Sequence, residues 1–179
     1  MLTLNFDQKK TLALYEYFFG NKYKVNSEEN DNTTVHVETQ KMCYLLKVCG
    51  IEIGDFNYTW NFKGPFSPGL LAMLRSMDRN ATGILNFYEQ VSEKESFLLD
   101  HKSDINKLKD KLEIDLHQKD RMQWIEILGS LTYISRTMLP NADFEVANQR
   151  LIQEKPDYCD LKINEYAWNI LNTANLLSY

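Results

Sequence analysis

Apolar side chains recur at helical spacing along most of this chain. In the longest such stretch Ile127, Leu131 and Ile134 form one stripe, and Pro140 ends the pattern. A spacing of three or four residues places side chains on one face of an α-helix, and proline does not continue a helix. We expect helices at about residues 5–20, 42–50, 67–77, 92–99, 103–112, 119–138, 144–155 and 160–174. The pattern therefore predicts a mainly α-helical fold.

Capping residues define several of these helix starts more closely. A side-chain oxygen at the N-cap accepts a hydrogen bond from a free backbone N–H, and proline fits the first helical turn because its missing N–H costs nothing there. The starts with such signals are Asn5 with Gln8, Ser67 with Pro68, and Ser92 with Glu95.

A different period appears between residues 56 and 62. Aromatic and small polar side chains alternate there, in the order Phe56, Asn57, Tyr58, Thr59, Trp60, Asn61 and Phe62. Strict alternation is typical of a strand with one buried and one solvated face. The apolar run at 84–88 fits either a helical turn or a short buried strand. We therefore predict a compact helical domain with one short aromatic strand or small β-element.

A polar segment at about residues 21–34 separates the first two helices. It contains seven consecutive polar residues, 27–33, and predicts a mobile surface loop. The helix before it is too short to fold alone. We therefore expect residues 1–179 to form a single domain.

Composition and charge exclude several classes of protein. Apolar residues make up 44% of the chain and charged residues 25%, as in soluble globular proteins, and no apolar run is long enough to span a membrane. The first seven residues lack the basic end and apolar run of a signal peptide. Three cysteines cannot all pair, so we expect free thiols in the cytoplasm. The net charge of -5 argues against a surface built as a whole for nucleic acid or anionic lipid.

The sequence carries no recognisable catalytic or metal-binding spacing. His36, His101 and His117 lie far apart, and the seven glycines form no phosphate-binding loop. Cys49 falls in an apolar stripe, which predicts a buried free thiol, and we expect a structural role for Cys159 as well. We therefore expect a non-enzymatic protein without metal or cofactor.

The segment from Trp60 to Ser67 is the candidate binding site. It joins a strand end, a tight turn and a helix N-terminus, whose free N–H groups and positive dipole end favour a phosphate or a carboxylate. It lies in a net-positive block, residues 41–80, with five basic and three acidic side chains. We assign partner binding to Trp60, Lys63, Gly64, Pro65, Phe66 and Ser67. A purely structural interpretation is also open, in which the same residues cap the helix, turn the chain and fill the core.

Two motifs in this region resemble small prokaryotic and phage proteins of the YwgA-like type and, more distantly, the Panacea (SocA-like antitoxin) domain. The first is the helical sequence K-x-x-Y-L-L at residues 41–46, and the second is W-x-x-x-G-P-F-S at residues 60–67, followed by a short leucine helix. A weaker similarity is L-x-x-x-K-P-x-Y at residues 151–158. The resemblance implies a mainly helical, often winged-helix-like fold and a role in toxin neutralisation, phage–host conflict or transcription.

Two functional hypotheses follow. The first is an antitoxin-like or host-modulating protein that binds another protein, a toxin or a host protein, through the Trp60–Ser67 segment, with no membrane involved. The alternative is a transcriptional regulator that binds nucleic acid through a winged-helix-like 41–80 region. Its expected contacts are Lys41, Lys47, Arg75 and Arg79, and its binding would weaken steeply with salt.

Overall fold

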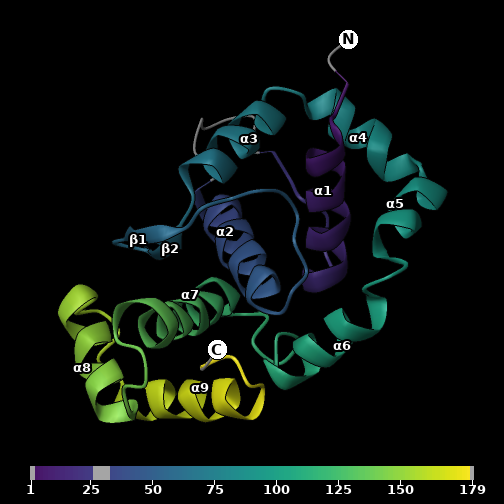
Figure 1. Cartoon of the computed structure of the whole chain (residues 1–179). Coiled ribbons are helices and arrows are strands. Elements are labelled where there is room, and N and C mark those ends of the chain that lie inside the picture. The colour runs from purple at the N-terminus through teal and green to yellow at the C-terminus, as the bar shows by residue number, and fades with distance from the viewer. Residues whose placement is uncertain (1–2, 26–32, 178–179) are drawn as a thin grey trace.

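The computed structural model describes residues 3–25 and 33–177. In this part of the chain the fold consists of nine α-helices, one π-helical turn and two short strands (Figure 1). The helices are α1 (Phe6–Phe19), α2 (Thr33–Val48), α3 (Pro68–Asp78), α4 (Ala81–Glu89), α5 (Val91–Leu98), α6 (Lys102–Lys111), α7 (Arg121–Tyr133), α8 (Phe144–Glu154) and α9 (Leu161–Thr173). A π-helical turn continues α7 over Ile134–Met138, and the strands are β1 (Thr59–Asn61) and β2 (Gly64–Phe66). The predicted mainly helical fold with a small β-element is confirmed.

Helices α2 and α7 form the centre of the molecule. They pack on each other more extensively than any other two elements of the described chain. Leu45 and Leu46 of α2 and Leu128 and Leu131 of α7 are fully buried and belong to one hydrophobic core. Helix α1 packs against α2, whereas α8 and α9 pack against α7, and α3 to α6 follow an arc outside α1 (Figure 1).

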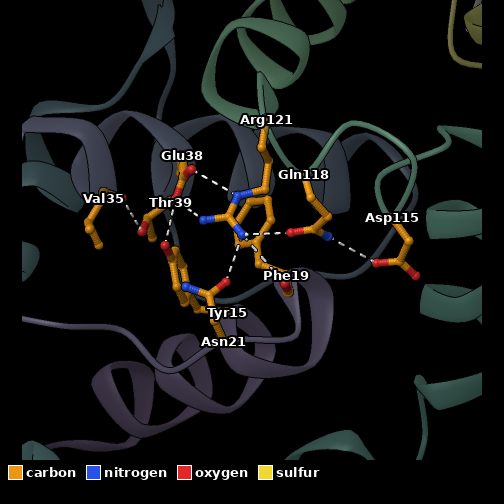
Figure 2. A network of polar contacts seen from close by, with 9 residues as sticks. All are labelled: Tyr15, Phe19, Asn21, Val35, Glu38, Thr39, Asp115, Gln118 and Arg121. Atoms are coloured by element: carbon orange, nitrogen blue, oxygen red, sulfur yellow. Dashed lines mark hydrogen bonds and ion pairs between the residues drawn. The ribbon is translucent and has the colours of Figure 1, made fainter.

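A buried polar network ties α1, α2 and α7 together (Figure 2). The Glu38 carboxylate of α2 accepts hydrogen bonds from Nε and Nη2 of Arg121, at 2.9 and 3.0 Å, and from the Tyr15 hydroxyl at 2.5 Å. Arg121 also donates to the Asn21 side chain at 2.7 Å, and its guanidinium lies 4.7 Å from the centre of the Phe19 ring. Because the Glu38 side chain is only 4% exposed, its charge depends on this one arginine for compensation.

Local capping explains where several helices begin. Asn5 and Gln8 form the predicted reciprocal capping box, and the Ser67 side chain accepts from the backbone N–H of Leu70 with Pro68 in the first turn. The prediction that Ser92 caps a helix is wrong. Helices α4 and α5 are joined by a single residue, Gln90, which takes the N-cap position of α5 two residues before Ser92.

Other sequence predictions have mixed outcomes. The ambiguous run at 84–88 lies within helix α4. Cys49 is exposed, because α2 ends at Val48, whereas Cys43 is buried. Residues 26–32 of the predicted loop lie outside the described residues, residues 21–25 form neither helix nor strand, and α2 begins at Thr33.

Strands β1 and β2 form an antiparallel hairpin that projects from the side of the helical body (Figure 1). Thr59 pairs with Phe66 and Asn61 with Gly64, so Phe62 and Lys63 form the turn. The predicted strand from 56 to 62 is therefore too long. Phe62, which alternation assigned to the buried face, is 73% exposed because it follows the last paired residue.

Candidate functional site

The hairpin is held in place by two polar side chains of α2. Gln40 forms two hydrogen bonds with the Ser67 backbone, accepting from its N–H and donating to its carbonyl, both at 2.9 Å. One residue further on, the Lys41 ammonium donates to the Pro65 carbonyl at 2.7 Å. All four residues are buried, so these bonds are made away from water. Residues 41–46 and 60–67 are thus in direct contact with each other.

Small residues allow β2 to approach α7 closely. Gly64 has a φ of +86°, a left-handed conformation that suits the residue after a two-residue turn. A Cβ atom at this position would overlap the hydroxyl of Ser130 on α7. On the same helix, a Cβ at Gly129 would lie 3.2 Å from the Lys41 side chain and 3.5 Å from Pro65. The contact between β2 and α7 therefore leaves no space for a side chain at position 64 and little at position 129.

Charged groups are buried behind the hairpin. Lys155, just after α8, pairs with Glu126 of α7, and their side chains are 3% and 5% exposed. Burial is the main cause that lowers the pKa of Lys41 to about 7, with the positive charges of Lys155 and Lys63 acting in the same direction and Glu126 opposing. Burial also lowers the pKa of Lys155. The cluster has more lysines than carboxylates, and it releases a proton from Lys41 near neutral pH.

The turn residues Phe62 and Lys63, which we call the tip, separate two hollows. The α3-side hollow, of about 380 Å³, is lined by Thr33, His36, Val37, Gln40, Lys41, Asn61, Phe62, Lys63, Phe66, Leu71, Arg75 and Asp78. The α8-side hollow, of about 550 Å³, is lined by Phe62, Lys63, Met122, Gln123, Glu126, Glu154, Lys155, Pro156, Asp157 and Tyr158. The tip contributes to both, so a large exposed aromatic ring stands between two concave surfaces.

The residues of the predicted binding segment have different surroundings. Gly64, Pro65 and Ser67 are buried and form the base of the hairpin. Trp60 and Phe66 are half-buried, and the Trp60 indole N–H donates to Glu154 at 2.9 Å. Lys63 is half-buried at the tip, and sequence reasoning did not single out its neighbour Phe62 as a contact. The signal that identifies Phe62 is its place directly before Lys63-Gly64, within the turn that Gly64 ends.

The four basic residues predicted to contact nucleic acid differ in their exposure and in their hydrogen-bond partners. Lys41 is 1% exposed and its ammonium is bonded to Pro65, so its prediction as a surface contact is corrected. Lys47 is half-buried and donates to the Phe56 carbonyl at 2.8 Å. Arg75 and Arg79 are exposed and lie four residues apart, in the last turn of α3 and at its C-cap. The burial of Lys41 was detectable in the sequence, because Lys41 lies four residues before Leu45 on the apolar face of its helix.

The histidines and the other potential metal ligands of the described chain lie apart from the hairpin tip or in contacts of their own. Among the described residues, no group of three or more His, Cys, Asp or Glu side chains is arranged to hold a metal ion. His36 shares a 2.7 Å hydrogen bond with Asp78, and His117 stacks on Trp124 at 4.1 Å between ring centres. No helix in the described part of the chain is long and apolar enough to span a membrane.

Comparison with known proteins finds no relative of this chain. No family model, no curated protein and no solved structure matches this chain significantly.

The protonation of Lys41 makes a testable contribution to stability. Between pH 7 and 10.5 the unfolded chain keeps a proton that the folded protein has released, so stability rises with pH in this window. The free energy of unfolding of the wild type, minus that of the Lys41→Met variant, is expected to increase by roughly 1 kcal/mol per pH unit from pH 7 to 10. Urea unfolding across this range measures the difference.

The matched control is Lys107→Met, because the Lys107 side chain is 68% exposed. Its difference from the wild type is expected to stay constant over the same pH range. A constant difference for Lys41→Met as well would show that the buried amine does not titrate as described.

Proposed function

We propose that this chain is a non-enzymatic binding protein that contacts another protein through the hairpin tip and the hollows beside it. The observation that carries the proposal is the contrast between a rigidly held base and an exposed aromatic tip. Gln40, Lys41 and Gly64 fix the base, whereas Phe62 is 73% exposed. An exposed aromatic side chain on a pre-ordered element loses little conformational entropy on binding, and such residues dominate protein interfaces.

The biological role that fits this activity best is antitoxin-like or host-modulating binding. It rests on the resemblance of residues 41–46 and 60–67 to YwgA-like and Panacea proteins, and the contact between these motifs supports it. The same resemblance favours a prokaryotic or phage origin and a cytoplasmic location. We expect the partner to be a toxin or a host protein.

The alternative function, nucleic-acid binding in transcription, has less support from the geometry. Of the four basic residues assigned to it, Lys41 is buried and Lys47 is engaged with the backbone. The two exposed arginines, Arg75 and Arg79, provide few of the phosphate contacts that a nucleic-acid interface uses.

Site-specific cross-linking tests the proposed contact. A photoreactive phenylalanine analogue at position 62 is expected to form one dominant adduct with a protein in cells that naturally contain this chain. The matched control is the same analogue at Leu85 of α4, which is 66% exposed and lies away from the hairpin. Mass spectrometry identifies the adduct. Identical adducts at both positions, or none at position 62, would rule out the tip as the contact.

A further inference from the structure

The α3-side hollow differs from the α8-side hollow in its charge. Two of its basic residues, Lys63 and Arg75, come from the tip and from α3, and neither forms an ion pair with a carboxylate of the described residues. The acidic residue in its lining, Asp78, already bonds to His36 at 2.7 Å and to the Tyr23 hydroxyl at 2.9 Å. Within residues 3–25 and 33–177, the cationic groups of Lys63 and Arg75 therefore have no ion-pair partner.

The α8-side hollow is also lined by Lys63, but its lining contains three carboxylates, those of Glu126, Glu154 and Asp157. Lys155 in its lining is paired with Glu126, and Glu154 is paired with Arg150 at 2.5 Å. Asp157 is exposed at its edge. An anionic partner group is therefore favoured on the α3 side of the tip and not on the α8 side.

Part of the lining of the α3-side hollow is apolar. Val37 of α2, Phe62 and Phe66 of the hairpin, and Leu71 of α3 line the volume of about 380 Å³ together with polar and charged residues. A space of this size accepts a large side chain, and the cationic groups stand at the tip and on the exposed side of α3.

We propose that the α3-side hollow binds an acidic segment of the partner protein, with one apolar side chain among Val37, Phe66 and Leu71 and carboxylates on Lys63 and Arg75. This inference rests on the proposed function and specifies the chemistry of the partner. Carboxylates pair well with an arginine fork, and opposite charges across an interface increase both association rate and specificity. A hollow that combines apolar residues with two cations that are unpaired among the described residues suits a peptide better than a nucleic-acid backbone.

Peptide selection tests this inference without knowledge of the natural partner. Random peptides displayed on phage are selected on the purified full chain and then measured on the Lys63→Glu/Arg75→Glu variant. Enriched peptides are expected to combine several Asp or Glu residues with a Phe, Trp or Leu, and to lose affinity by about tenfold or more on that variant. The matched control is Lys111→Glu/Lys119→Glu, which reverses two exposed lysines away from the hollow and should leave affinity unchanged.

The outcomes separate the two proposals. Enriched peptides that are neutral or basic, and that still require Phe62 when tested on Phe62→Ser, would overturn the acidic preference and leave the binding tip standing. Selected peptides that bind Phe62→Ser as well as the wild type would overturn both. A duplex DNA fragment that displaces the peptides, with affinity falling steeply with salt, would assign the surface to nucleic acid and overturn the proposal.

Discussion

Replacing Gly64 by Ala is expected to lower the free energy of unfolding by about 2–5 kcal/mol. Two causes add. The residue holds a φ of +86°, which any side chain disfavours, and the new Cβ would overlap the Ser130 hydroxyl. The hairpin would have to move off α7, so the hydrogen bond from Lys41 to Pro65 would be lost as well. Equilibrium unfolding in urea measures the change.

A double-mutant cycle separates the steric cause from the conformational one. The Ser130 hydroxyl is buried without a hydrogen-bond partner among the described residues, so Ser130→Ala alone should change stability little or increase it. In the Ser130→Ala background, Gly64→Ala is expected to cost only about 1–2 kcal/mol, the cost of the left-handed backbone. An equal cost in both backgrounds would contradict the close packing of β2 on α7.

Replacing Arg121 by Ala is expected to be as damaging, at about 3–5 kcal/mol. The substitution leaves the Glu38 carboxylate buried without its charge partner and removes the link between α7 and the end of α1 (Figure 2). Tyr15, which donates to the same carboxylate, would remain as its only protein donor within the network drawn. Thermal and urea unfolding measure the loss.

A neutral side chain at position 38 should recover part of this lost free energy of unfolding. Adding Glu38→Gln to Arg121→Ala removes the unpaired charge and is expected to restore about 1–2 kcal/mol. Lys107→Ala, which breaks an exposed pair with Asp104, is the control and should cost no more than about 0.5 kcal/mol. If Arg121→Ala lowered the free energy of unfolding no more than this control does, the network would not stabilise the fold.

The helices were predictable because their signals are local. The capping box at Asn5 and the Ser67-Pro68 start depend only on residues within one turn, and both are confirmed. The prediction that Ser92 caps a helix failed because the start of α5 depends on where α4 ends, which is a tertiary constraint. The strand was predicted too long because aromatic alternation continues to Phe62, although pairing stops at Asn61.

The candidate site was harder to predict because its groups come from distant parts of the chain. Lys41 is a charged residue whose partners, Pro65, Glu126 and Lys155, come together only when β2 and α8 pack against α2 and α7. Sequence reasoning identified the segment that forms the hairpin. It did not distinguish the residues of the buried base from Phe62 at the exposed tip, because that distinction depends on where the strands stop pairing.

The most direct test of the proposed binding site is the affinity of the partner captured at position 62. Its dissociation constant is measured by titration calorimetry with the wild type, Phe62→Ser and the control Leu85→Ser. Both replaced side chains are largely exposed, so both variants should unfold as the wild type does. We expect Phe62→Ser to weaken binding by about tenfold or more and Leu85→Ser to leave it unchanged. Equal affinity of the wild type and Phe62→Ser would contradict the proposed binding site.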